Sequence, residues 1–376
     1  MITRVRIVLV TLVLLSYVTI PDAVSSASES PALDLLVSGA RKEGVLDLMI
    51  SSSQGEKGAI ELTTAFKRRF NLDITINADL SGQESQKFNQ AVAETRNRIT
   101  PSFDLIEGTA ENVLLLKESG GAEMVTDWEP LLAEIAPKAF QAKRKVSPTV
   151  LSGYGFLRGT RTLVLLYNPK VISERDLPKT WQAMGESKYA GAFSVPPWIS
   201  HALMGLLKYE KSEWLEIVKT WGKNKRDILT YSAGVARMLL GDLKFLYAND
   251  HYYYEQKDKD PNAPIAIFFF NDLVPESEVM YVVRKDARHP NAAKLFALWA
   301  TSSEANLIYE KYSHQPNLAL GTGPISKETK KALKAQNINP VGWFESPQNL
   351  EKFLWLKTEE GQKYQKAMAR AHREGK

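Results

Sequence analysis

Short apolar runs alternate along the chain with stretches whose apolar residues recur at helical spacing. An amphipathic stretch at 56–70, for example, places Ile60, Phe66 and Phe70 on one side of a predicted helix. Predicted strands occupy the short apolar runs at 45–50, 72–76, 103–106, 163–167, 192–195, 228–231, 265–270 and 278–284. The repeat of strand, turn and helix predicts an α/β fold in which parallel strands bring their loop ends to one edge.

The second half of the chain continues this pattern. The run 163–167 is apolar throughout, as in a strand buried on both faces, and 176–181 predicts the start of a helix. The tail from Ser326 is charged and predicts helices. The glycines at 153, 155 and 159 do not fit the G-x-G-x-x-G spacing, so a dinucleotide site is rejected.

Residues 1–27 resemble a secretory signal peptide. Arg4 and Arg6 precede an uncharged, mostly apolar run from Ile7 to Ile20, and small residues follow. This run is shorter than the roughly 20 residues that span a bilayer, so cleavage is favoured over a short uncleaved anchor. The chain has no cysteine, which excludes disulfides, thiolate metal sites and an acylated lipoprotein anchor. We therefore expect an exported protein in a Gram-negative periplasm.

The charge of the chain is only mildly basic. The net charge of +5 falls to +4 when two arginines and one aspartate leave with residues 1–27. The remainder, about 350 residues, is long enough for two domains, and we expect a monomer. No long basic block with interleaved aromatic residues is present, so nucleic-acid binding is not expected, and anionic ligands are mildly favoured.

The segment Asn249-Asp250-His251-Tyr252-Tyr253-Tyr254-Glu255 is the most distinctive in the chain. As a strand it would direct alternate tyrosines to opposite faces, whereas as a helix or turn it can bring neighbouring tyrosines to one site. The rings either cover a core or form a binding site. In a binding site, phenol oxygens can hydrogen-bond an anion or hold a hard metal ion as phenolates.

Polar and aromatic residues follow several of the predicted strands. Side chains at the carboxyl edge of an open α/β sheet commonly bind ligands, although Ser and Thr there also cap helices. Trp198 either stacks on a ligand or packs its own loop, and the small-residue turn at Ser232 can bind an anion through backbone N–H groups. The candidate ligand-binding residues of this type are Ser51, Ser52, Thr109, Trp198 and Ser232.

Four short motifs together resemble the periplasmic solute-binding proteins of ABC importers. They are Ala40-Arg41-Lys42-Glu43-Gly44, Tyr167-Asn168-Pro169-Lys170, Leu177-Pro178-Lys179-Thr180-Trp181, and His289-Pro290-Asn291-Ala292-Ala293-Lys294-Leu295-Phe296. Each motif is weak alone, but their order and spacing are similar to the ferric-iron-binding branch of the type 2 periplasmic-binding-protein fold (extracellular solute-binding family 1). The resemblance covers nearly all of the chain after residue 27.

The resemblance implies two lobes, each a mixed sheet flanked by helices, with a ligand cleft between them. The chain would cross between lobes near Gly159 and near 275–279, so each lobe would be discontinuous. Lobe 1 would comprise residues 28–159 and 277–325, and lobe 2 residues 160–276 and 326–376. The partner implied is an inner-membrane ABC permease.

The resemblance also implies ligands. Adjacent tyrosines supply phenolate ligands to ferric ion in this branch, and the matching pair here is Tyr252 and Tyr253. The anion-binding arginine of the family falls at Arg161. Members with a histidine in the first lobe carry it after the first strand, where this chain has Gln54-Gly55-Glu56, so Glu84 is a loosely placed acidic candidate.

The expected function is therefore periplasmic capture of Fe(III), together with a synergistic anion, for import. The missing histidine leaves a second possibility, the same receptor role for a small organic or phosphorylated anion. A secreted hydrolase is the weakest alternative, because the chain has neither H-E-x-x-H nor G-x-S-x-G. No catalytic residue and no catalytic cofactor are predicted.

Overall fold

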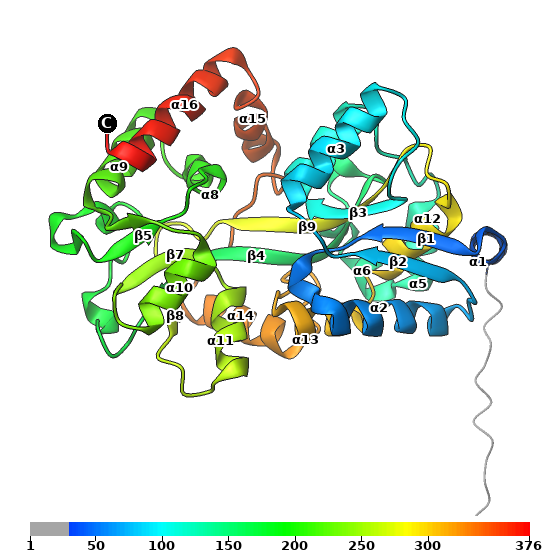
Figure 1. Cartoon of the computed structure of the whole chain (residues 1–376), viewed down its shortest axis with the longest axis horizontal. Coiled ribbons are helices and arrows are strands. Elements are labelled where there is room, and N and C mark those ends of the chain that lie inside the picture. Colours follow the sequence, from blue (N-terminus) through cyan, green and yellow to red (C-terminus); the bar gives the residue numbers. More distant parts are fainter. Residues whose placement is uncertain (1–29) are drawn as a thin grey trace, which may run out of the picture.

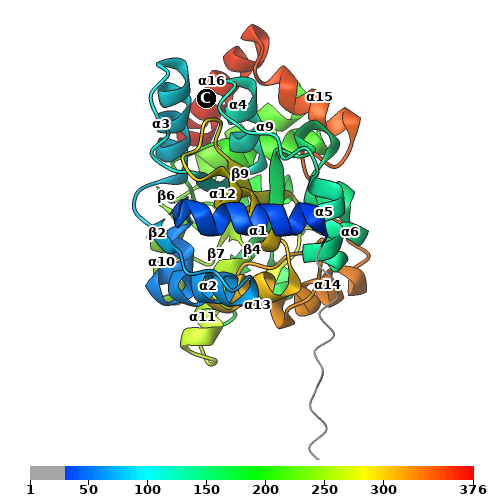
Figure 2. The ribbon, with the colours of Figure 1, turned by 90° about the vertical axis from the view of Figure 1, so that its right-hand side faces the viewer.

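The computed structural model describes residues 30–376, and the predicted signal peptide lies outside them. Figure 1 shows two groups of helices and strands, one on each side, joined through the middle by long strands. Figure 2, turned by 90°, places α1 in front of the right-hand group. No helix within residues 30–376 is long and apolar enough to cross a membrane.

The right-hand group in Figure 1 is formed mainly by the first part of the chain. Its helices and strands are α1 (Pro31–Glu43), β1 (Val45–Met49), η1 (Ser52–Gln54), α2 (Gly55–Arg69), β2 (Thr75–Asp79), α3 (Glu84–Arg96), β3 (Leu105–Thr109), α4 (Ala110–Glu118), α5 (Trp128–Ile135), α6 (Pro137–Gln141), α7 (Lys143–Val146) and η2 (Thr149–Leu151). The chain then enters the long strand β4 (Gly155–Tyr167).

The left-hand group follows β4. It contains η3 (Glu174–Asp176), η4 (Ala183–Gly185), η5 (Ser187–Tyr189), β5 (Phe193–Val195), α8 (Ser200–Leu203), η6 (Met204–Leu207), α9 (Lys211–Asn224), β6 (Asp227–Ile228), α10 (Tyr231–Leu239), β7 (Phe245–Asn249), α11 (His251–Lys259) and β8 (Ala266–Phe268). The last part of the chain comprises β9 (Glu276–Val283), α12 (Pro290–Trp299), α13 (Ser303–Ser313), α14 (Pro324–Ala335), α15 (Pro347–Trp355) and α16 (Glu359–Glu374).

The strands form one mixed sheet in the order β2-β1-β3-β9-β4-β7-β5-β6, with β8 also paired to β4. Strands β1, β2 and β3 are parallel, and β9 is antiparallel to both β3 and β4. Strand β4 pairs with β9 up to Thr162 and with β7 from Leu163 onward. One strand therefore connects the two groups, and the predicted α/β class with a mixed, helix-flanked sheet is confirmed.

Local sequence explains where α1 begins and ends and where α10 begins. The Ser30 hydroxyl accepts a hydrogen bond from the Leu33 N–H, and Gly44 ends α1 in the left-handed conformation at φ 70°. At α10 the Thr230 hydroxyl accepts from the Ala233 N–H. This cap places Tyr231 in the helix, so the predicted strand 228–231 is wrong beyond Ile228.

Three other sequence predictions need correction. Ile60 is 57% exposed, so it lies on the solvent side of α2, while Phe66 and Phe70 are buried as predicted. No α-helix starts at 176–181, where Pro178 follows a single 3₁₀ turn, η3. The second strand begins at Thr75 rather than at residue 72, although Leu72 is buried.

Candidate functional site

Arg161 lies on β4, close to the point where this strand changes partner from β9 to β7. Its Nη1 is 3.6 Å from Glu84 Oε2, and the two side chains are 16% and 26% exposed. Its Nε is buried and has no hydrogen-bond partner among residues 30–376. Arg161 therefore holds a positive charge at the centre of the molecule with one donor free to bind a ligand.

Glu84, at the start of α3, has other partners besides Arg161. Its Oε1 accepts hydrogen bonds from the backbone N–H of Thr109 (2.6 Å) and from Asn112 Nδ2 (2.7 Å). These bonds tie α3 to the start of α4 and orient the carboxylate toward Arg161. The structure thus brings together three residues that the sequence proposed separately, namely Glu84, Thr109 and Arg161.

Two histidines lie close enough to Arg161 for its charge to act on their pKa values, and neither was assigned a role from the sequence. Burial, with Arg161 as the next cause, lowers the pKa of His201 to about 4 and that of His251 to about 3. His201 Nδ1 is 2.6 Å from the Tyr231 hydroxyl, whereas His251 Nδ1 is buried and has no partner within the part of the chain that the structure describes. Both rings are therefore neutral at pH 7, and His251 has a ring nitrogen that can hydrogen-bond a ligand.

The aromatic residues extend the site from these histidines. The rings of His251 and Tyr252 are 4.2 Å apart, and the Tyr252 hydroxyl is 3.5 Å from Ser232 Oγ. Trp198 packs edge-on against Tyr231 at 5.2 Å. We call the set Glu84, Thr109, Arg161, Trp198, His201, Tyr231, Ser232, His251 and Tyr252 the Arg161 site.

Tyr253 has different neighbours from Tyr252. It contacts Tyr254 edge-on, and burial followed by the charge of Glu328 raises its pKa. Tyr254 in turn is hydrogen-bonded to Thr329 on α14. The segment is a helix, in which consecutive side chains differ in direction by about 100°. Tyr252 and Tyr253 therefore point in different directions, and among the described residues they share no hydrogen-bond partner.

Ser51 and Ser52 lie at the carboxyl end of β1, as expected. The Ser51 N–H donates to Glu107 (3.3 Å), and its hydroxyl is 2.9 Å from Ser53 Oγ. Ser52 is exposed. No hydrogen bond of the described structure joins either serine to the Arg161 site, so their part in ligand binding stays a prediction.

A separate group, Asp47, Asp104 and His289, has the residue types of a metal site, with ligand atoms within 4.8 Å of one another. Its oxygens already have donors, however. Asp104 accepts from the backbone N–H groups of Asp47 (2.8 Å) and His289 (3.1 Å), and Asp47 pairs with Arg288 at 2.6 Å. This cluster ties β1 to the start of α12 and is explained without an ion.

The fold matches that of the two-lobed periplasmic binding proteins. Iron-bound HitA from Pseudomonas aeruginosa matches with a TM-score of 0.59 and 17% identity, covering 78% of this chain and 99% of that chain. Trichodesmium FutA in complex with iron and citrate matches with a TM-score of 0.64 and 17% identity, covering 87% and 99%. The spermidine/putrescine-binding protein PotD from Streptococcus pneumoniae matches with a TM-score of 0.61 and 13% identity, covering 85% and 99%. At these identities the likeness establishes the fold alone.

The sequence identifies the family more directly. The profile described as "Bacterial extracellular solute-binding protein" matches residues 131–349, more than half of the chain. This chain therefore belongs to that family of bacterial extracellular solute-binding proteins. A search of curated protein sequences gives no match.

Proposed function

We propose that this protein is the periplasmic receptor of an ABC importer and that its solute presents an anionic group to Arg161. The observation that carries the proposal is the unpartnered, buried Nε of Arg161. An arginine in this position binds a carboxylate or phosphate through its planar donors. The free Nδ1 of His251 and the hydroxyls of Ser232 and Tyr252 lie in the same site and can contribute further hydrogen bonds.

The preferred solute is a small organic or phosphorylated anion. Glu84 is the nearest carboxylate to Arg161, and at 3.6 Å its ion pair is long. A ligand anion can therefore compete for the guanidinium while Glu84 keeps its bonds to Thr109 and Asn112. The separate surroundings of Tyr252 and Tyr253 also favour a ligand that needs one phenol rather than two.

Ferric ion with a bound anion is the second candidate. The adjacent Tyr252 and Tyr253 supply the oxygen ligands that a hard trivalent ion prefers. Iron-bound HitA and iron-and-citrate-bound FutA, which share the fold, support it. In this case Arg161 would hold the anion, Tyr253 would turn toward Tyr252 on binding, and Fe(III) would be cargo rather than a cofactor.

The test is calorimetric titration of the purified protein, freed of bound solute by unfolding and refolding, with phosphate, citrate, pyridoxal phosphate and ferric citrate. We expect binding of at least one of these anions, and Arg161→Gln should weaken it about 10-fold or more because a charge-assisted bond is lost. Arg288→Gln, which alters an arginine outside the site, is the matched control. Equal affinity in wild type and Arg161→Gln would refute the anion assignment.

Absorption spectroscopy separates the two candidates. A visible tyrosinate-to-iron band after addition of ferric citrate, absent in the Tyr252→Phe, Tyr253→Phe double variant, would establish iron as the solute. Anion binding without such a band would establish the organic or phosphorylated solute. In either case a ligand at 100 times its Kd should add about 2.7 kcal/mol to the unfolding free energy.

A further inference from the structure

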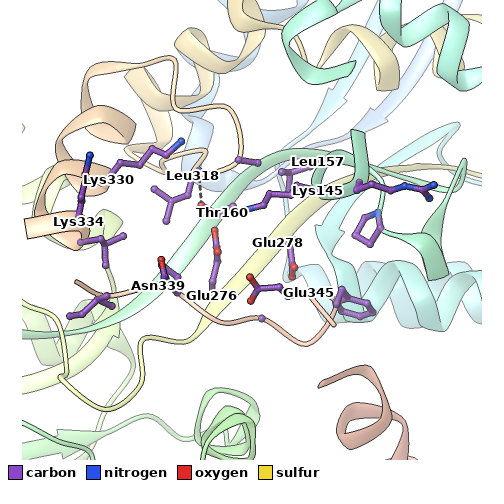
Figure 3. Close-up of a pocket in the computed structure, with 18 of the residues that line it drawn as sticks. Lys145, Leu157, Thr160, Glu276, Glu278, Leu318, Lys330, Lys334, Asn339 and Glu345 are labelled. Atoms are coloured by element: carbon purple, nitrogen blue, oxygen red, sulfur yellow. Dashed lines mark hydrogen bonds between the residues drawn. The ribbon is translucent and has the colours of Figure 1, made fainter. Parts of the chain in front are cut away.

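A cavity of about 770 Å³ lies between the short helix α7, strands β4 and β9, helix α14 and the segment 337–345. Figure 3 shows the two strands crossing this cavity, with Glu276, Glu278 and Glu345 grouped on one side and Lys330 and Lys334 on α14 at the other. None of its lining residues belongs to the Arg161 site.

The cavity lies on the opposite face of the β4–β9 ladder from Arg161. In this ladder Thr160 is paired with Glu278, Arg161 with Ser277 and Thr162 with Glu276. Successive side chains of a strand point to opposite faces, and paired residues share a face. Thr160, Glu276 and Glu278 therefore face the cavity, while Arg161 faces away from it.

The charged residues around the cavity differ in how deeply they are buried. Glu276 and Glu278 are partly buried on its floor, while the cations Arg144, Lys145, Lys330 and Lys334, together with Glu345, are exposed around its mouth. Among the described residues, none of these side chains has an oppositely charged partner within 4.0 Å. The cavity thus contains carboxylates and cations that do not neutralise one another in direct pairs.

Glu278 is the carboxyl group of the cavity that most clearly lacks a hydrogen-bond donor. Its Oε2 is buried and accepts no hydrogen bond from any described residue. Gly342 closes over it so tightly that a Cβ added there would lie 3.1 Å from Glu278 Oε1. Burial raises the pKa of Glu278 well above its usual value and that of Glu276 to about 7, as expected for carboxyl groups without a cationic partner.

We propose that this cavity is a second binding site and that it takes a free amino acid with an apolar side chain, bound with its ammonium group toward Glu276 and Glu278 and its carboxylate toward Lys330 and Lys334. An ammonium at the floor supplies the missing donor to Glu278. A lone anion would supply no donor to Glu278 Oε2, and a lone cation would meet four cations at the mouth, so a zwitterion fits both ends. Leu157, Leu318, Leu333 and Phe344 provide apolar surface for the side chain.

The test is calorimetric titration of the refolded protein with L-leucine and L-phenylalanine. N-acetyl-L-leucine, which lacks the ammonium, and L-leucinamide, which lacks the carboxylate, are the matched ligands. We expect at least one amino acid to bind and each half-charged analogue to bind about 10-fold or more weakly, since each loses a charge-assisted contact. Absence of binding by both amino acids at millimolar concentration, or equal binding of the analogues, would overturn the proposal.

Variants locate the binding. Glu278→Gln and the double variant Lys330→Gln, Lys334→Gln should each weaken amino-acid binding about 10-fold. Lys331→Gln, an exposed lysine on the same helix that does not line the cavity, should leave it unchanged. The lysine variants remain informative if Glu278→Gln fails to fold.

Arg161→Gln separates this proposal from the proposed function. Amino-acid binding should survive that substitution, because Arg161 is on the other face of the ladder. Its loss in Arg161→Gln with retention in Glu278→Gln would place the amino acid in the Arg161 site and overturn the second site. Failure of anion binding alone would leave the cavity proposal standing.

Discussion

Arg158 and Glu107 form an ion pair in which the side chains are 0% and 1% exposed. Arg158 Nε donates to Glu107 Oε1 at 3.0 Å, and the Tyr281 hydroxyl donates to Oε2 at 3.1 Å. The same oxygen accepts the Ser51 N–H. The pair thus joins β3, β4 and β9 and fixes the turn after β1.

Removing the charge of Glu107 should destabilise the protein strongly. Glu107→Gln leaves Arg158 buried without its counter-ion, so we expect a loss of about 3–5 kcal/mol in unfolding free energy. Urea unfolding measures it. Glu304→Gln is the control, because its partner Arg68 is 68% exposed and that pair should contribute less than about 1 kcal/mol. Similar losses in both variants would contradict the expectation that burial increases the contribution of the Arg158–Glu107 pair to the unfolding free energy.

Gly108 allows β3 to approach α3 closely. A Cβ at this position would lie 2.2 Å from Cε2 of Phe88, whose ring is fully buried, and 3.0 Å from Glu84 Oε1. Gly108→Ala should therefore cost about 1–3 kcal/mol through overpacking. It should also weaken solute binding, because Glu84 and Thr109 both shift. Adding Phe88→Leu should restore part of the stability, and a lack of any recovery would argue against the clash as the cause.

The sequence predicted those parts of the fold that depend on local signals. Gly44 ends α1 because a left-handed residue is needed there. The apolar run 163–167 is the part of β4 that pairs with β7 on one side and, from Leu165, with β8 on the other. Ile60 was misassigned because periodicity shows that a helix has an apolar face but does not fix its exact edges. The lobe boundaries near Gly159 and 275–279 stay a prediction.

The site was less accessible from the sequence, because it depends on contacts between distant segments. Nothing local indicates that Glu84 pairs with Arg161 or that Thr109 donates its N–H to Glu84. His251 could have been considered, since it directly precedes the tyrosine pair. The different surroundings of Tyr252 and Tyr253 follow from the helical conformation of 251–259, which the sequence left undecided between helix and strand.

Acid should destabilise the protein through His251. Burial lowers its pKa in the folded state to about 3, against 6.5 for a free histidine, so the unfolded chain binds more protons between these values. Its contribution to stability is therefore full above pH 6.5 and is lost as the pH falls toward 3. At pH 4.5 the loss should be about 2–3 kcal/mol by linkage.

Urea unfolding of wild type and His251→Gln at pH 8, 7 and 4.5 tests this expectation. The stability difference between the two proteins should be nearly the same at pH 8 and 7, where the ring is mostly neutral in both states. It should move in favour of the variant at pH 4.5, because glutamine takes up no proton. A constant difference across all three values would show that His251 is not held neutral by the fold.

Single tyrosine substitutions decide how the solute is held. If the solute is an organic or phosphorylated anion, Tyr252→Phe should weaken binding about 5- to 10-fold, since its hydroxyl lies beside Ser232 in the Arg161 site and a neutral hydrogen bond is lost. Tyr253→Phe should then change the affinity less than about 3-fold, because Tyr253 packs toward Tyr254 and Glu328. Titration of both variants with the best-binding anion gives the ratio directly. A loss of affinity in Tyr253→Phe equal to that in Tyr252→Phe would contradict the one-phenol arrangement, and it is the result expected if both oxygens bind ferric ion.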